Sequence, residues 1–281
     1  MRPAFAYHRP ATVQEACRIL AAEPRAAVLA GGTDLMVHLT QSWRGKRPPA
    51  VVNVKRIPGL DAVQVTDRAL RLGALATLSA LMEHPVVQAE LPVLPFAARY
   101  MGSPAIRNLA TVGGNLCNSS PAADLPPVLL ALDAEVGIAG PGGERRLPLA
   151  SFFRGPGQTA LGPGELLVWI EVDRRRLSWP VRYERLDVRR AMDIAIAGAA
   201  VSVGRGEARV ALCAVAPTPF RVAEAEAVLA EQGLTDGAVE RAAALAMAAA
   251  RPITDVRATA EYRRQMVGVL VRRGLEALRH G

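Results

Sequence analysis

The sequence contains little of what several common protein classes need. Its 281 residues include only three cysteines and 4% aromatic residues, and only two of its 34 basic residues are lysines. The cysteines, Cys17, Cys117 and Cys213, are widely separated, which argues against a disulfide framework and against an iron–sulfur centre held by this chain alone. No apolar run reaches the roughly 18 to 20 residues of a membrane-spanning helix, and no signal-peptide core follows Met1. We therefore expect a cytoplasmic protein without a transmembrane segment.

What is present indicates a folded protein with a basic surface. Hydrophobic residues make up 51% of the chain, enough to bury the core of one large or two modest domains. The formal net charge of +8 raises nucleic acid or another anionic surface as a partner. However, the arginines are spread over the whole chain, and the aromatic residues on which single-stranded nucleic acids stack are scarce. A solvated, arginine-rich surface is therefore favoured over nucleic-acid binding, with docking faces for acidic partner subunits as an intermediate possibility.

Local patterns in the first part of the chain predict short, mixed elements. Thr12 and Glu15 have the spacing of a capping box, which predicts a helix over 13–22. We expect strands at 26–30, 51–54 and 166–172, hairpins at 63–73 and 135–147, and helices at 85–101 and 125–132. The segment 103–120 is rich in small residues and is predicted to contain neither helix nor strand.

An arginine cluster at 174–176, followed by Pro180, is predicted to mark a boundary. Beyond it we expect strands near 181–185, 194–203 and 208–214, and then helices near 221–231, 236–250 and 259–278. Strands followed by helices are typical of an α+β unit, here of about 100 residues.

A double glycine lies between a predicted strand and a predicted helix start. The loop consists of Val28, Leu29, Ala30, Gly31, Gly32, Thr33, Asp34 and Leu35. Glycine lets the backbone turn sharply and approach a ligand, because no Cβ is in the way. The amides freed by such a turn favour an anion such as a phosphate, to which Thr33 can donate. The same residues also suit an ordinary strand-to-helix turn capped by Thr33, and neither P-loop nor GxGxxG spacing is present.

A second loop of similar composition follows further along the chain. It combines a hydroxyl, paired glycines and an amide, in Thr111, Gly113, Gly114 and Asn115. Asp124 comes just before a predicted helix, where it either caps the helix or accepts hydrogen bonds from ligand hydroxyls. Two such loops indicate one ligand with two polar or anionic ends, gripped from both sides, as a dinucleotide would be.

Longer segments around these loops carry a more specific pattern. They read Ala30-Gly31-Gly32-Thr33-Asp34-Leu35 and Ile106-Arg107-Asn108-Leu109-Ala110-Thr111-Val112-Gly113-Gly114-Asn115, and the pattern continues at 120–125, 164–167, 183–185 and 193–195. Together they resemble the FAD-binding subunits of molybdenum hydroxylases. This family includes the carbon monoxide dehydrogenase medium subunit, the xanthine dehydrogenase flavin domain and the hydroxybenzoyl-CoA reductase flavin subunit. The order of elements agrees over essentially the whole chain.

The resemblance implies an α+β fold. Two subdomains would form an FAD-binding fold of the vanillyl-alcohol-oxidase / cresol-methylhydroxylase type, followed by a C-terminal α+β domain. The implied units are 1–57, 58–175 and 176–281, with FAD between the first two. By the same resemblance, residues 28–35 hold the FAD pyrophosphate, and Thr111, Gly113, Gly114 and Asn115 hold it from the other side.

Further roles are implied by the resemblance. Asp124 would accept hydrogen bonds from FAD hydroxyls, Met101 and Leu167 would pack on the flavin or adenine, and Arg185 would stabilise anionic reduced flavin. No histidine lies in a flavin-linkage motif, so His38 is expected to be structural and FAD to be bound non-covalently. No catalytic or metal-binding residue is expected on this chain.

The resemblance also implies partners. A large subunit would carry molybdopterin, a small subunit would carry two [2Fe-2S] clusters, and the complex would be a dimer of heterotrimers. This chain would take electrons from the clusters and pass them to an external acceptor. Two alternatives remain open at this point, namely a stand-alone flavin-dependent reductase or oxidase of the same fold and a basic nucleic-acid-binding module.

Overall fold

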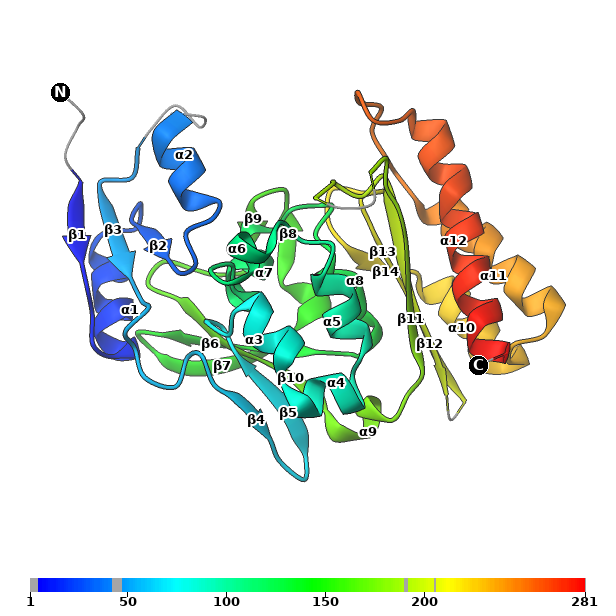
Figure 1. Ribbon diagram of the computed structural model, residues 1–281, viewed down its shortest axis with the longest axis horizontal. Helices are drawn as coiled ribbons and strands as arrows, with labels where there is room; N and C mark the ends of the chain where they lie inside the picture. The colour runs from blue at the N-terminus through cyan, green and yellow to red at the C-terminus, as the bar shows by residue number, and fades with distance from the viewer. Residues whose placement is uncertain (1–4, 42–46, 190–191, 205, 281) are drawn as a thin grey trace.

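The three larger of the four sheets in the described residues follow one another along the long axis of the molecule (Figure 1). The computed structural model describes residues 5–41, 47–189, 192–204 and 206–280. Its mixture of strands and helices in separate units confirms the predicted α+β class. No helix within these ranges is long and apolar enough to cross a membrane.

The first sheet is small and parallel. Its strand order is β1-β3-β2, and it consists of β1 (Ala6–His8), β3 (Ala50–Asn53) and β2 (Ala27–Leu29). Helix α1 (Val13–Ala22) begins where predicted, because the Thr12 hydroxyl accepts a hydrogen bond from the Glu15 amide. The Glu15 carboxylate in turn accepts from the Ala11 amide, one residue before the cap. Helix α2 (Leu35–Gln41) follows strand β2 after the loop that contains the double glycine.

The second sheet is antiparallel and has the order β4-β5-β10-β6-β7. Its strands are β4 (Val63–Val65), β5 (Ala69–Gly73), β10 (Leu166–Asp173), β6 (Glu135–Gly140) and β7 (Gly143–Pro148). The two predicted hairpins and the predicted strand are therefore confirmed. Short elements accompany the sheet, namely α3 (Leu78–Glu83), α4 (Pro85–Glu90), α5 (Val93–Ala98), α6 (Pro104–Arg107), α7 (Val112–Asn118), α8 (Leu125–Ala131), η1 (Leu149–Ser151), β8 (Phe153–Gly155), β9 (Gln158–Thr159) and α9 (Arg174–Leu177).

Two predictions in this region are wrong. The segment 103–120 contains α6 and α7, whose first turns are held by the Ser103 and Thr111 hydroxyls. These caps offset the poor helix propensity of the glycines that follow Thr111. The single helix predicted over 85–101 is divided into α4 and α5, and Pro92 lies at the division.

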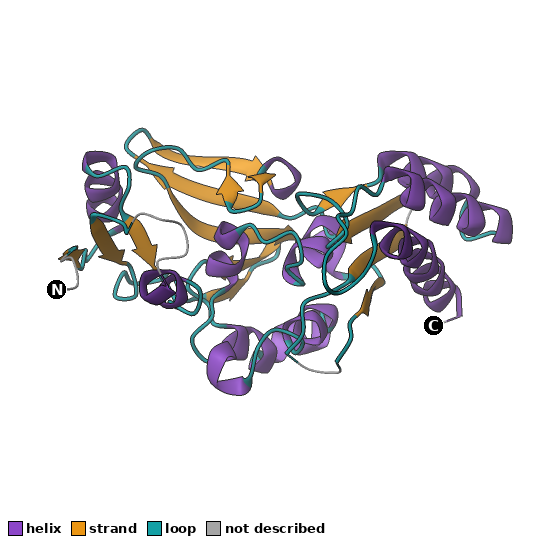
Figure 2. Ribbon diagram, turned by 90° about the horizontal axis from the view of Figure 1, so that it is seen from above, coloured by secondary structure: helices purple, strands orange, loops and turns teal. Residues whose placement is uncertain are grey.

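The third sheet belongs to the C-terminal part and is antiparallel. Its strands, in spatial order, are β11 (Val181–Leu186), β12 (Ala197–Gly204), β13 (Glu207–Cys213) and β14 (Phe220–Arg221). One face is covered by the three helices that end the chain, α10 (Ala223–Gln232), α11 (Asp236–Ala249) and α12 (Ala260–His280). Figure 2 shows these helices at the outer end of the molecule. The predicted order of strands followed by helices beyond Pro180 is thus confirmed.

Helix α8 lies between the second and third sheets. All of its residues are buried, and it contacts β12 and β13 on the face opposite the terminal helices. The apolar core of the second sheet continues without a break into the third through Tyr183, Ala200, Ala211 and Cys213. The C-terminal part therefore shares its core with the part that precedes it.

Candidate functional site

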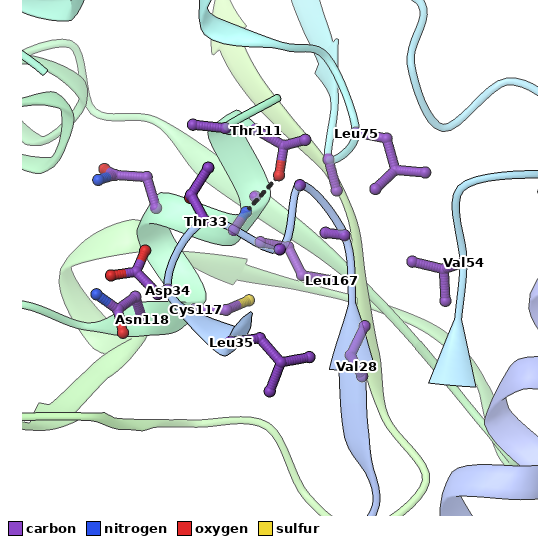
Figure 3. Close-up of a pocket in the computed structure, with 18 of the residues that line it drawn as sticks. Val28, Thr33, Asp34, Leu35, Val54, Leu75, Thr111, Cys117, Asn118 and Leu167 are labelled. Atoms are coloured by element: carbon purple, nitrogen blue, oxygen red, sulfur yellow. Dashed lines mark hydrogen bonds between the residues drawn. The ribbon is translucent and has the colours of Figure 1, made fainter. Parts of the chain in front are cut away.

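A cavity of about 450 Å³ lies where the first sheet meets the helices and strands of the second unit. Its wall is formed by the β2–α2 loop, residues 101–106, helix α7 and the start of β10 (Figure 3). Most of the residues predicted to bind a cofactor line this cavity, namely Val28, Ala30, Gly31, Gly32, Thr33, Asp34, Leu35, Met101, Thr111, Gly113, Gly114, Asn115 and Leu167. The two glycine loops, distant in the sequence, thus meet in one place.

The first glycine loop is built for close backbone approach. Gly32 has a φ of +85°, a conformation that side-chain-bearing residues rarely adopt. A Cβ at Gly31 would lie 2.1 Å from the Leu109 carbonyl oxygen, so only glycine allows the loop to touch the segment before α7. Within the described residues, the backbone N–H groups of residues 31 to 34 donate no hydrogen bond. A half-buried row of unpaired amides suits an anion, which such amides can hold by hydrogen bonds.

Thr33 and Asp34 complete this loop, and Figure 3 shows both beside the cavity. The loop turns the chain from β2 into α2 as expected, but the Thr33 hydroxyl forms no capping hydrogen bond with any described residue. Its hydroxyl is available to donate to a ligand oxygen.

The second glycine loop resembles the first in sequence but works differently. Its amides are already used: Val112 and Gly113 donate to the carbonyls of Ala76 and Ala74, and Gly114 donates to the Thr111 hydroxyl oxygen at 3.0 Å. A Cβ at Gly113 would lie 2.6 Å from Ala74, so this glycine is needed for packing of α7 against the sheet. The second loop therefore offers side chains to a ligand where the first offers amides.

Asn115 is the clearest of these side chains. Its Oδ1 atom is buried and has no hydrogen-bond partner in the described structure, and the residue lines the cavity. A buried amide oxygen without a donor is costly unless a ligand or water supplies one. Thr111, although it accepts from Gly114, keeps its hydroxyl hydrogen free to donate.

One end of the cavity is apolar. Val28, Leu35, Val54, Leu75 and Leu167 project from three different elements and two loops toward the same space (Figure 3). Such a surface suits a flat aromatic ring system, which gains from burial and not from hydrogen bonding.

Three predicted residues do not line the cavity. The Leu29 side chain lies under Gly32, where a Cβ at Gly32 would approach its Cδ1 to 2.9 Å. Asp124 is 5% exposed and makes no cap hydrogen bond. Its carboxylate instead accepts from the Tyr183 hydroxyl at 2.7 Å and lies 3.3 Å from the Arg185 Nε atom. Arg185 is thus held behind the wall of the cavity by a buried acid.

Several residues of the wall were missed by the sequence reasoning. They include Val54, Leu75, Cys117, Asn118 and Glu165, and His38, which was expected to be structural, lines the cavity as well. Asn118 follows Gly114 by four residues, so a helix at 112–118 would have placed both on one face. Burial raises the pKa of the Cys117 thiol to about 12, which keeps it neutral and poorly nucleophilic.

Comparison with known proteins now decides the family. Residues 3–173 match the family described as the FAD binding domain in molybdopterin dehydrogenase, and residues 183–278 match the CO dehydrogenase flavoprotein C-terminal domain. The chain belongs to this family of FAD-binding oxidoreductase subunits.

Relatives of this FAD-binding subunit align over nearly the whole chain. The carbon monoxide dehydrogenase medium chain of Hydrogenophaga pseudoflava is 34% identical, covering 98% of this chain and 97% of its own. The 6-hydroxypseudooxynicotine dehydrogenase complex subunit alpha of Paenarthrobacter nicotinovorans is 33% identical, covering 99% and 95%.

Solved structures agree with this assignment. A chain of carbon monoxide dehydrogenase from Hydrogenophaga pseudoflava has a TM-score of 0.92 at 34% identity and covers 99% of this chain and 98% of its own. A chain of quinoline 2-oxidoreductase from Pseudomonas putida 86 has a TM-score of 0.90 at 26% identity, with the same coverage. The chain is therefore a medium, FAD-binding subunit of the molybdenum hydroxylase type.

The residues of the cavity fit FAD. The amides of residues 31 to 34 suit the negatively charged pyrophosphate of FAD. The unpaired Oδ1 atom of Asn115 suits a hydrogen-bond donor of FAD, and the apolar end of the cavity suits one of its ring systems. Among the described residues, no cluster of histidine, cysteine, aspartate and glutamate side chains suits a metal ion.

Proposed function

We propose that this subunit binds FAD non-covalently in the cavity and passes electrons from the [2Fe-2S] clusters of a partner subunit to an external acceptor. The observation that carries the proposal is the row of unpaired amides at 31–34 facing a cavity between two units of the fold. The proposed partners are a molybdopterin-binding large subunit and a two-cluster small subunit, in a dimer of heterotrimers. Bound FAD supplies the ability to take up two electrons one at a time and release them to a different acceptor.

The contribution of the chain itself is binding and orientation. The first glycine loop would hold the pyrophosphate with amides and the Thr33 hydroxyl, and Thr111 and Asn115 would contact it from α7. We propose that residues 1–57 and 58–175 form the two walls, since β1 to β3 lie in the first range and β4 to β10 in the second. Residues 176–281 form the third unit.

The first prediction concerns flavin binding by the single chain. The purified chain, freed of cofactor and then mixed with FAD, is expected to retain about one flavin per protein after gel filtration, as measured by visible absorbance. Gly32→Val and Gly114→Val are expected to abolish retention, because a side chain strains the backbone at Gly32 and presses on the Thr111 hydroxyl at Gly114.

Gly142→Val is the matched control, because a Cβ at this position meets no atom within 4 Å. It should bind FAD as the wild type does, and circular dichroism should show an intact fold in all three variants. Flavin retention by Gly32→Val equal to that of the wild type would contradict the proposed binding site.

The second prediction separates a subunit from a complete enzyme. The FAD-loaded chain alone is expected to oxidise no substrate, and activity should require both partner subunits. The measurement is dye reduction with the chain alone and with the reconstituted complex. Substrate oxidation by the isolated chain would favour the stand-alone flavin enzyme instead.

A further inference from the structure

The C-terminal unit, residues 176–281, contributes no described residue to the wall of the cavity. It does carry large apolar side chains that remain in contact with solvent. In the connection between α11 and α12, Ile253 is 71% exposed and Val256 is 100% exposed. Burial of these side chains against the rest of the chain does not explain them, and exposed apolar side chains that cluster on a folded protein mark a surface for another protein.

The connection between α11 and α12 is fixed by hydrogen bonds, although residues 251–259 contain neither helix nor strand. The Asp255 carboxylate accepts from the backbone amide of Arg257 at 2.8 Å, and the Asp255 amide donates to the Ala258 carbonyl at 3.1 Å. These bonds hold the backbone on both sides of Val256. A loop that is already ordered presents its side chains to a partner with little further loss of conformational entropy.

Arg263 of α12 joins this connection to the third sheet. Its side chain is nearly inaccessible, and its guanidinium donates to the Asp255 carboxylate at 2.6 Å and to the Ile196 carbonyl at 2.8 Å. Ile194, two residues before that carbonyl, and Tyr262, next to Arg263, are both exposed. The exposed apolar side chains that Arg263 brings together are called the C-terminal patch, and they are Ile194, Ile253, Val256 and Tyr262.

The charges beside the C-terminal patch favour an acidic partner. Residues 251–264 contain four arginines and only two acids. Arg251 is exposed, and its side chain donates to backbone carbonyls of described residues, so no described acid neutralises it. A basic rim repels a second copy of this chain, which has a formal net charge of +8, and attracts a surface with acidic side chains.

We infer that the C-terminal patch docks the molybdopterin-binding large subunit, at an apolar hollow of that subunit with an acidic rim. The inference rests on the proposed function, which supplies two partner subunits. The cluster-carrying subunit has to reach the cavity, because its electrons pass to FAD there. The patch lies on the unit that forms none of the described cavity wall, and Figure 1 shows the α11–α12 connection far from the β1–β3 sheet. The patch therefore suits the other subunit.

The test uses the full-length chain loaded with FAD and the two partner subunits, each purified separately. Val256→Glu and Ile253→Glu place a carboxylate within the patch, and neither removes a buried side chain, so the fold should be kept. Ala227→Glu is the matched control, because it makes the same change in charge at an exposed position of α10, outside the patch. The readouts are the Kd for each subunit, from biolayer interferometry at low and high salt, and the Kd for FAD.

Both patch variants are expected to raise the Kd for the large subunit by about tenfold or more, because a carboxylate is desolvated at the centre of an apolar contact and faces an acidic rim. The Kd values for the small subunit and for FAD should stay at those of the wild type, and Ala227→Glu should match the wild type throughout. High salt should weaken binding of the large subunit to the wild type, since the rim is charged and exposed.

An unchanged Kd for the large subunit in Val256→Glu and Ile253→Glu would overturn the inference. Weaker binding of the small subunit instead, self-association of the wild type that the two variants abolish, or an equal change in Ala227→Glu would overturn it as well. A wild type that binds FAD but not the large subunit would also overturn the inference, whereas failure of the wild type to bind FAD would overturn the proposed function.

Discussion

Asp124 makes stability depend on pH in an unusual direction. Burial raises its pKa to about 6, against the opposing effects of the Arg185 charge and the Tyr183 hydroxyl, while Asp187 adds to the rise. The native protein therefore holds this proton to a higher pH than the unfolded chain does. Stability falls as pH rises from the unfolded pKa toward 6, and it does not recover above that pH.

The pH prediction compares the wild type with Asp124→Asn, which cannot ionise. Between pH 4 and 7 the wild type is expected to lose about 3 kcal/mol of unfolding free energy relative to the variant. The measurement is urea denaturation at a series of pH values. A free-energy difference between the two proteins that stays constant over this range would show that Asp124 is ionised normally in the folded state.

At the scale of elements, the close contact between the first glycine loop and the segment before α7 determines the shape of the cavity. Gly31→Ala places a methyl group where the Leu109 carbonyl oxygen now lies. Because the obstacle is backbone, the two segments must separate, at a cost of about 1–3 kcal/mol. The variant should bind FAD more weakly, as measured by fluorescence titration. Gly142→Ala, whose methyl group meets no neighbour, should have the stability and the FAD affinity of the wild type. Wild-type stability and FAD affinity in Gly31→Ala would instead show that the two segments are free to move apart.

Elements with a clear sequence period were predictable, and those held by tertiary contacts were not. The hairpin at 135–147 and the strand at 166–172 alternate or are continuously apolar, and both occur close to their predicted bounds. Helix α7 was missed because its amides at Val112 and Gly113 are satisfied by carbonyls of the distant turn that follows β5, at 74–76, which no local pattern reveals. Strand β1 pairs with β3 across more than forty residues, and three residues are too few to show a period.

The candidate site was predictable where the backbone itself carries the function. Glycine pairs mark close approach, and the residues of both loops line one cavity. The prediction could not distinguish a glycine that frees amides, such as Gly32, from one that allows packing, such as Gly113, since each belongs to a glycine pair next to a polar residue. Nor could it pair Asp124 with Arg185, because β11, the strand that carries Arg185, begins more than fifty residues after Asp124.

For the whole molecule, the arginines that first made nucleic acid a candidate partner have another role. Many are paired with acids across elements, such as Arg71 and Arg146 with Glu171 and Arg272 with Glu240. Others join the C-terminal unit to the rest. Charges neutralised in this way contribute little to the attraction of a phosphate backbone.

The two ends of α8 are held by acids that face the C-terminal unit, Asp124 at its start and Asp133 just beyond its end. Asp133 accepts hydrogen bonds from Arg209 of β13 and Arg221 of β14 and pairs with Arg176 of α9, so it ties both parts of the chain together. Its φ of +52° is one that asparagine also tolerates, so Asp133→Asn removes the charge without adding backbone strain. We expect a loss of about 2–3 kcal/mol, less than for a fully buried pair because Asp133 is 25% exposed.

This loss should appear in calorimetry as a change in cooperativity. The wild type, with one core continuous from the second sheet into the third, should unfold in a single transition. In Asp133→Asn the C-terminal unit should unfold first, giving two transitions. High salt should weaken the ion pairs of Asp133 in the wild type, because they are partly exposed, and so shift the wild type toward two transitions as well. A single transition at the wild-type temperature in the variant would mean that apolar packing around α8 holds the two parts together without help from these charges.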